Sequence, residues 1–219
     1  MASFSWNTIP VYMMDFEGSP GSGVVEFGVV CLRGGAIVDT GTGLCAPVGS
    51  IAGRDREVHG ISETDVRDKA PFANYYRQFV GYREEGVFAA HNRHAENNFL
   101  KGTWAVPALV PDWRNGSGKT NEWGPWIDTL AIYKALYPGL ESCALGELVD
   151  RFHLRKQLEV LSTIHCPPSR RRAHCALYDA LASSLLLLRL EGEELLLGHL
   201  TLEWLLSFSK GYSGQQELF

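Results

Sequence analysis

"VYMMDFEG" (residues 11–18) is an apolar run that ends in two acidic residues separated by one position, Asp15 and Glu17. In an extended strand alternate side chains lie on the same face, so both carboxylates point the same way. Neighbouring carboxylates repel each other and cost stability unless a cation lies between them. The pattern predicts a strand that ends at a cation-binding site, with an exposed strand end as the alternative.

The composition is that of a globular protein with no global attraction for polyanions. The 219 residues are 45% hydrophobic and 21% charged, with a net charge of −5. One domain of this length can bury a proper core. A polyanionic partner would have to be held by a local basic patch or by bound metal.

The cysteines and the leucine-rich segment bear on localisation. Five cysteines without a framework spacing predict reduced thiols and a cytoplasmic protein. His165-Cys166 and His174-Cys175 lack a CxxC partner, so a zinc site is not expected. We expect no signal peptide and no membrane span, because charged residues interrupt the apolar stretch 181–206.

The order of the predicted elements defines the fold class. Apolar, β-branched-rich runs separated by Gly/Pro turns predict a strand meander, and later apolar runs alternate between strand and helix spacing. The expected strands are 9–16, 24–33, 35–47 and 86–92, the expected helices are 71–82, 95–104 and 145–154, and a strand-to-helix unit follows at 126–136. This order predicts an α/β fold with a mixed sheet and helices on both faces.

Two segments lack this periodicity. Residues 105–125 are rich in Pro, Gly and Trp and predict a long loop in which the tryptophans pack against the domain. We expect the folded domain to span residues 1–208 and a flexible tail to occupy 209–219.

Acidic side chains recur at the ends of other predicted elements. Glu96 follows the buried strand that ends at His91 and Asn92, and His174 and Asp179 open an apolar helix. Helical residues five apart are separated by about 140°, so Asp179 is expected in the helix and His174 on the loop before it. Singly, each residue also fits a surface, core or first-turn role. Together, carboxylates at one edge of an open α/β sheet suit Mg²⁺ or Mn²⁺.

The ordered motifs resemble the DnaQ-like (DEDDh) 3′→5′ exonucleases of the ribonuclease H-like superfamily. The matching segments, in chain order, are Asp15-Phe16-Glu17, EFGVV (26–30), VHGIS (58–62), AAHNRHAENNFL (89–100), IDTLAIYKAL (127–136) and HCALYDA (174–180). The resemblance covers roughly residues 8–190. It implies a ribonuclease H-like mixed five-stranded sheet with helices on both faces.

The resemblance also implies the roles of the acidic residues. Asp15 would bridge two Mg²⁺ or Mn²⁺ ions, Glu17 and Asp179 would complete the first, and Glu96 would serve the second through water. His174 would accept the proton of the attacking water, since a free histidine has a pKa of about 6.5. The product would be a nucleoside 5′-monophosphate released from a 3′ end. Substrate contacts are implied at Phe16, Gly18, Ser19, His59, His91, Asn92 and Arg172.

Two positions depart from the family pattern. Ala95-Glu96 stands where the family has Phe-Asp, so the acid is one methylene longer and a packing ring is missing. The second metal would therefore shift or bind more weakly. Gly18-Ser19 replaces threonines that contact the terminal nucleotide in the family.

Three functions stay open at this point. The favoured one is a 3′→5′ deoxyribonuclease in replication proofreading or repair. The others are a 3′→5′ exoribonuclease of the same fold and a catalytically impaired nucleic-acid-binding module, the latter suggested by Glu96. The run Arg170-Arg171-Arg172 is either a solvated loop or a phosphate contact beside His174.

The C-terminal residues carry a further motif. Gln215, Leu218 and Phe219 form the pattern Gln-x-x-Leu-Phe, which is similar to the peptide by which bacterial polymerases and repair proteins dock on the sliding clamp. Leu218 and Phe219 would be apolar anchors, with Gln215 bonding at the pocket rim. The alternative is a terminal phenylalanine that folds back onto the domain. The motif favours DNA over RNA as the bound nucleic acid.

Overall fold

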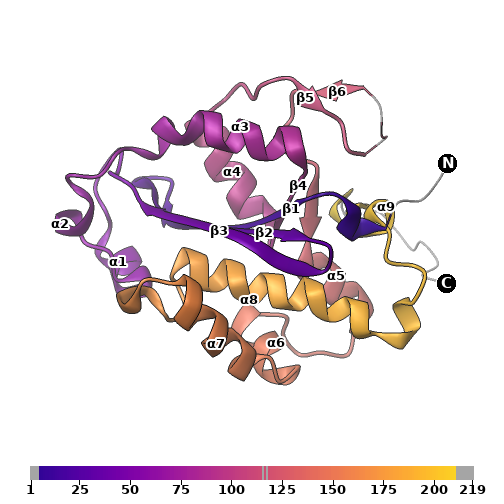
Figure 1. Cartoon of the computed structure of the whole chain (residues 1–219). Coiled ribbons are helices and arrows are strands. Elements are labelled where there is room, and N and C mark those ends of the chain that lie inside the picture. The colour runs from indigo at the N-terminus through magenta and orange to yellow at the C-terminus, as the bar shows by residue number, and fades with distance from the viewer. Residues whose placement is uncertain (1–4, 115, 117, 211–219) are drawn as a thin grey trace.

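A computed structural model of the chain describes residues 5–114, 116 and 118–210 (Figure 1). Its main sheet contains β1 (Val11–Ser19), β2 (Gly23–Arg33), β3 (Ala36–Leu44), β4 (Val87–Ala90) and β7 (Trp126–Asp128). The strand order is β3-β2-β1-β4-β7. The first three strands form the antiparallel meander, and β4 and β7 continue parallel to β1. The predicted mixed five-stranded sheet is confirmed.

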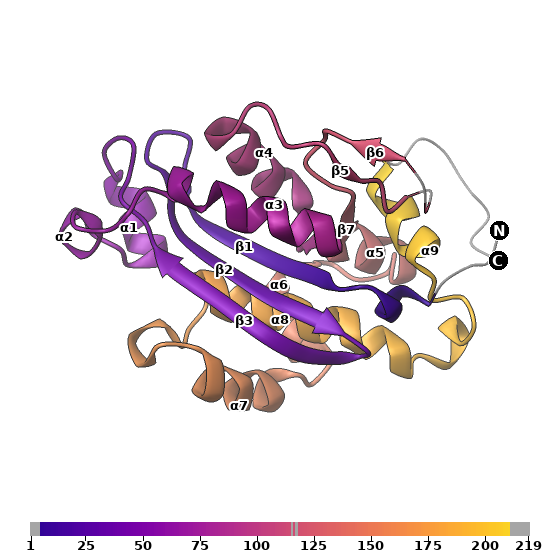
Figure 2. The same ribbon diagram turned by 45° about the horizontal axis from the view of Figure 1, so that its top comes forward.

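Helices cover both faces of this sheet (Figures 1 and 2). One face carries α3 (Tyr76–Glu85) and α4 (Arg93–Thr103). The other carries α8 (Ala176–Arg189), with α6 (Leu145–Arg151) and α7 (Arg155–His165) packed beyond it. The remaining helices are α1 (Gly53–His59), α2 (Glu63–Val66), α5 (Thr129–Leu136) and α9 (Leu202–Ser207). Short 3₁₀ turns lie at Trp6–Thr8, Phe72–Tyr75, Pro168–Arg170, Leu190–Gly192, Glu194–Leu196 and Phe208–Lys210.

The central strand β1 explains why its sequence begins as an unbroken apolar run. Val11 and Met13 belong to the core cluster that α8 covers, whereas Tyr12 and Met14 belong to the cluster under α3 and α4. Because both faces of β1 are covered, alternation of polar and apolar residues is absent until the strand reaches Asp15.

Helix α8 lies directly on the backbone of β2. A Cβ atom at Gly28 would be 2.2 Å from the backbone nitrogen of Leu177, so only glycine allows this approach. The start of α8 therefore packs directly against the sheet at β1 and β2.

The segment 105–125 is more ordered than the predicted loop. It contains a short hairpin of β5 (Val110–Pro111) and β6 (Lys119–Thr120). The expected packing of tryptophan is confirmed, since Trp123 is 3% exposed and its indole N–H donates to the carbonyl of Trp104 at 2.9 Å. The leucine-rich stretch after residue 181 divides into α8, two 3₁₀ turns and α9. Among the described residues no helix is long and apolar enough to cross a membrane.

Candidate active site

Strand β1 ends in a bulge immediately after its two acidic residues. The register against β2 shifts between Glu17 and Gly18, and Gly18 has a φ of 144°. A Cβ at Gly18 would lie 2.1 Å from the carbonyl oxygen of Gly23, which excludes any other residue there. Asp15 and Glu17 are partly exposed and lie on the face of β1 opposite to the face that carries Met14. They therefore lie at the strand end on the side that α8 covers.

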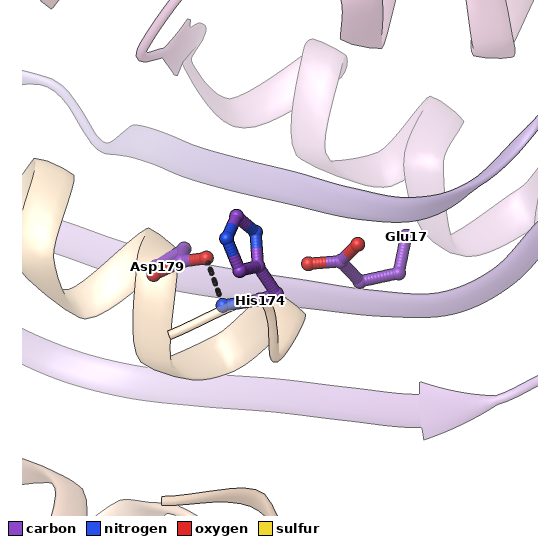
Figure 3. Close-up of side chains that lie close together, drawn as sticks. All are labelled: Glu17, His174 and Asp179. Atoms are coloured by element: carbon purple, nitrogen blue, oxygen red, sulfur yellow. Dashed lines mark hydrogen bonds between the residues drawn. The ribbon is translucent and has the colours of Figure 1, made fainter. Parts of the chain in front are cut away.

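The start of α8 brings two further groups to these carboxylates. Ligand atoms of Glu17, His174 and Asp179 all lie within 4.8 Å of one another (Figure 3). His174 precedes the helix with a φ of 59°, and its backbone N–H donates to Oδ2 of Asp179 at 2.8 Å. The prediction that His174 lies outside the helix is confirmed. The imidazole is exposed, while this hydrogen bond fixes the backbone that carries it.

Glu96 is buried on the other side of the same group of acids. It lies in the first turn of α4, is 4% exposed, and its Oε2 atom has no hydrogen-bond partner among the described residues. Burial raises the pKa of Glu96 to about 8, and the nearby carboxylates of Asp128 and Glu17 act in the same direction. An orphaned buried carboxylate oxygen requires a partner, because an unpaired polar atom in the interior costs about 1–3 kcal/mol.

Asp128 is a site residue that the sequence interpretation missed. It ends β7 and begins α5 as the N-cap, and its Oδ1 accepts hydrogen bonds from the backbone N–H groups of Ala131 and Asn92, both at 3.2 Å. The signal was present, since an aspartate directly before an apolar helix is a typical N-cap. Its link to Asn92 places the start of α4, and thus Glu96, relative to the sheet.

The electrostatics of the cluster favour a bound cation. Burial raises the pKa of Asp15, and the carboxylates of Asp179 and Glu96 raise it further. Burial likewise raises the pKa of Glu17 to about 8 and that of Asp179 to about 6. Carboxylate oxygens and an imidazole within a few ångströms, together with the unpaired Oε2 of Glu96, form a donor set that suits a hard divalent ion.

A buried ion pair under the site was also missed. Glu26 lies opposite Glu17 on β2 and is 2% exposed. Both of its carboxylate oxygens accept hydrogen bonds from Arg170, and one of them also accepts from the backbone N–H of Ala176 at 2.9 Å. Arg170 further donates to the carbonyl of His59 at 2.7 Å. This pair connects β2, the end of α1 and the first residue of α8, and it is wrong to count Arg170 as a free phosphate contact.

The other arginines of the run differ in availability. Arg171 donates to the carbonyls of Cys166 and Thr163 and so folds back on α7. Arg172 donates to the carbonyl of His59 at 3.1 Å but is exposed. Among these arginines, Arg172 is therefore the one placed to meet a ligand from solvent.

Three of the implied substrate contacts have side chains that are buried or engaged in internal hydrogen bonds. The side chain of Phe16 packs in the core against Phe72, so only its backbone can reach a substrate. His59 is 2% exposed and its Nδ1 accepts from the N–H of Ile61 at 3.0 Å. His91 bonds to the hydroxyl of Thr129 through Nδ1 and to the Cys143 carbonyl through Nε2, both at 2.9 Å. Burial limits the side chains of Phe16 and His59, and internal hydrogen bonds engage both ring nitrogens of His91; the implied substrate contacts at these residues stay predictions.

The remaining implied contacts stay accessible or lie elsewhere. Gly18 and Ser19 are partly exposed in the bulge and turn after β1, and Asn92 is exposed at the start of α4. The motif residues Gln215, Leu218 and Phe219 lie outside the described residues.

The fold and this acidic cluster define a nuclease class of hydrolase, and sequence comparison agrees. A model of the exonuclease family, RNase_T, matches residues 16–187, and the chain belongs to this family. The predicted resemblance to DnaQ-like exonucleases is confirmed at this level. Exonucleases of this family and fold use divalent metal ions, which fits the donor group of Glu17, His174 and Asp179.

Relatives include components of DNA polymerase III. The DNA polymerase III PolC-type protein of Thermotoga maritima is 30% identical over 131 residues, which are 60% of this chain and 9% of that protein. DNA polymerase III subunit epsilon of Buchnera aphidicola is 27% identical over 165 residues, 75% of this chain and 61% of that protein. The chain therefore spans less than two thirds of the length of these relatives.

Solved structures share the fold. Exonuclease X in complex with 5′ overhanging duplex DNA has a TM-score of 0.62 at 23% identity, with 91% of this chain and 99% of that chain covered. The nuclease domain of 3′hExo, a DEDDh family member bound to rAMP, has a TM-score of 0.58 at 15% identity, with 90% and 97% covered.

Proposed function

We propose that the chain is a metal-dependent 3′→5′ exonuclease that hydrolyses DNA to nucleoside 5′-monophosphates in replication proofreading or repair. The observation that carries the proposal is the convergence of Glu17, His174 and Asp179 within 4.8 Å at the end of β1. The DNA polymerase III relatives and the DNA complex of exonuclease X support DNA as the substrate.

The acidic residues have a direct role in this chemistry. Asp15, Glu17, Glu96 and Asp179 would hold two Mg²⁺ or Mn²⁺ ions, which when bound neutralise the carboxylates and stabilise charge on the scissile phosphate. The buried Oε2 of Glu96 would gain the partner that it lacks among the described residues.

His174 would act as the general base. Its imidazole is exposed, and the hydrogen bond from its backbone N–H to Asp179 fixes its position beside Glu17. It would accept the proton of a water molecule that attacks the phosphorus, after which the bond to the 3′ oxygen breaks. The terminal nucleotide leaves with its 5′ phosphate.

Two substrate contacts belong to the same proposal. Arg172 is exposed next to His174 and would meet a phosphate of the incoming strand. The backbone at Phe16, Gly18 and Ser19 lines the end of β1 and would lie against the terminal nucleotide.

A second candidate is a 3′→5′ exoribonuclease. It is favoured by the likeness of the fold to the 3′hExo nuclease domain, which is bound to rAMP. The third, a nucleic-acid-binding module with impaired catalysis, would follow if the longer side chain of Glu96 prevented productive metal binding.

One experiment separates these functions. The purified chain is incubated with 5′-labelled single-stranded DNA and RNA of identical sequence, with Mg²⁺ or Mn²⁺, and with EDTA as the control. We expect DNA to shorten stepwise from its 3′ end, with deoxynucleoside 5′-monophosphates as products. Preferential shortening of RNA would support the second candidate, and binding without cleavage would support the third.

We also propose the sliding clamp as a partner, through Gln215, Leu218 and Phe219. The kinship with DNA polymerase III components supports this docking. Titration of a bacterial clamp with the full chain and with a version ending at Gly214 tests it. Equal binding by both versions, or binding by neither, contradicts the role of the motif.

A further inference from the structure

A pocket of about 620 Å³ lies against α4, the helix that also carries Glu96. Its lining combines one face of α4, the wall formed by residues 121–126, and α9 with the turn that follows it. α9 packs against β7 and contributes Leu206 to the lining. The volume lies within the range of about 300–1,000 Å³ that is typical of ligand sites.

Two cations of α4 face this pocket without an acidic partner. Arg93, Asn97 and Lys101 line it at four-residue spacing, so they form one stripe along the helix. Neither Arg93 nor Lys101 has a carboxylate within 4.0 Å among the described residues. Lys101 is exposed, whereas Arg93 is partly buried and donates one hydrogen bond to the carbonyl of Ser209 at 2.7 Å, so Lys101 is the more accessible of the two. The one acidic side chain that lines the pocket, Glu122, is paired with Arg114 at 3.0 Å. The stripe is thus a local positive field in an otherwise acidic chain.

The opposite wall of the pocket is rigid and largely apolar. It includes Trp123, Pro125 and Trp126, and Leu206 adds an apolar contribution from α9. The two indoles are 3% and 5% exposed, so the wall presents their edges and not open ring faces. Buried Arg83 holds this segment by donating hydrogen bonds to the carbonyls of Ala108, Thr120 and Glu122. Its guanidinium also lies 5.0 Å from the ring centre of Trp123. These contacts tie the wall to α3.

The pocket and the acidic cluster draw side chains from the same helix, α4. Arg93 and Glu96 are three residues apart, so they lie one helical turn from each other on neighbouring faces. From Arg93 to Lys101 the stripe extends about 12 Å along the helix axis, at 1.5 Å per residue. A stacked single strand carries one phosphate per about 3.4 Å, so the stripe can accompany several nucleotides.

We infer that this pocket is a second nucleic-acid subsite, which binds the part of the DNA strand that leads away from the scissile bond. Arg93 and Lys101 contact its phosphates, and the apolar wall accommodates its bases. A cationic stripe facing an apolar wall is the combination that single-stranded nucleic acid requires. The inference rests on the proposed exonuclease function and assigns residues that the catalytic cluster does not use.

The test measures DNA binding and the length dependence of cleavage. Binding of a fluorescein-labelled 12-nucleotide DNA is followed by anisotropy in EDTA over a series of salt concentrations. A single-strand phosphate contact adds about 0.7 to the slope of log K against log[salt], or about fivefold in affinity at 0.1 M salt. Lys101→Gln should therefore lose about fivefold in affinity and about 0.7 in slope. The double variant with Arg93→Gln should lose about 25-fold, if the contacts act independently.

Lys156→Gln is the matched control. Lys156 is also an exposed helical lysine, but it lies on α7, on the opposite face of the sheet (Figure 1). It should bind the 12-nucleotide DNA as the parent chain does.

Cleavage separates this inference from the proposed function. With Mg²⁺, the Lys101→Gln variant should lose kcat/KM on the 12-nucleotide DNA but much less on a dinucleotide, which is too short to occupy both sites. Equal losses on both substrates, or binding and salt slope equal to those of Lys156→Gln, would overturn the subsite. If the parent chain cleaves neither substrate, the proposed function fails, whereas the binding series still decides whether the pocket holds DNA.

Discussion

Neutralising Glu26 tests whether the buried ion pair under the site holds the catalytic helix in place. The side chains of Glu26 and Arg170 are 3% and 12% exposed, so neither charge has much access to water once its partner is lost. Removing one member of a buried pair costs about 3–5 kcal/mol, since it leaves an uncompensated charge. Glu26→Gln keeps the shape of the side chain and one hydrogen-bond acceptor. We therefore expect the free energy of unfolding to fall by about 3 kcal/mol, the lower end of this range.

The same substitution should impair turnover more than binding. Glu26 accepts the N–H of Ala176, the first residue of α8, so its loss allows His174 and Asp179 to shift relative to Glu17. A displacement of about 1 Å costs on the order of 10²-fold in rate. We expect kcat to fall by about 10–100-fold with a much smaller change in KM.

A double-mutant cycle gives the decisive measurement. Urea unfolding at pH 7, followed by circular dichroism, compares Glu26→Gln, Arg170→Met and the double variant. Because the double variant leaves no unpaired buried charge, it should be less destabilised than the sum of the singles, by about 2 kcal/mol or more. Glu57→Gln, at an exposed position of α1, is the control and should change stability by less than about 0.5 kcal/mol. Additive effects, or single losses below about 1 kcal/mol, would refute the reasoning.

Further predictions concern the acidic cluster itself. Asp15→Ala and Asp179→Ala should each abolish hydrolysis with an unchanged circular dichroism spectrum; substantial activity in either variant would contradict the metal-ligand assignment. Glu96→Asp should keep or raise the activity and Glu96→Ala should lose it, and parent-like activity of Glu96→Ala would mean that another acid serves the second ion. His174→Ala should lower kcat by about 10²–10⁴-fold while DNA binding in EDTA is retained; weakened binding at an unchanged rate would make it a phosphate contact instead. Finally, the folded state raises the pKa of Glu17 and Glu96 from 4.5 to about 8, so the folded metal-free protein binds more protons than the unfolded chain. Its stability should therefore be highest below about pH 4.5 as far as these two groups contribute, and fall as the pH rises towards 8. Thermal unfolding in EDTA should show this fall, and Mg²⁺ should raise Tm more at pH 8 than at pH 5.5; a Tm in EDTA that rises over this range would count against the burial of these carboxylates.

The local features of this protein can be predicted from short stretches of its sequence. The alternation in Asp15-Phe16-Glu17 puts both carboxylates on one face of a strand, and the five-residue spacing of His174 and Asp179 places the histidine outside the helix. Both features depend only on the repeat of a strand or a helix, so a short segment is sufficient to predict them. The order of strands and helices likewise follows from local periodicity and turn residues.

Which polar groups are free to act depends on contacts between segments that are distant in the chain. Glu26 and Arg170 are 144 residues apart, and nothing near either residue indicates that they pair under the site. Both ring nitrogens of His91 are hydrogen-bonded to Thr129 and Cys143, which come from later segments of the chain. The partners of a buried polar group are set by packing between distant segments. A buried polar group that lacks a hydrogen-bond partner costs free energy, so most buried polar groups are paired. A group that is paired in this way has a structural role. Contacts between separate elements therefore distinguish the structural residues from those that can bind a ligand, and the residue spacing within a single element does not.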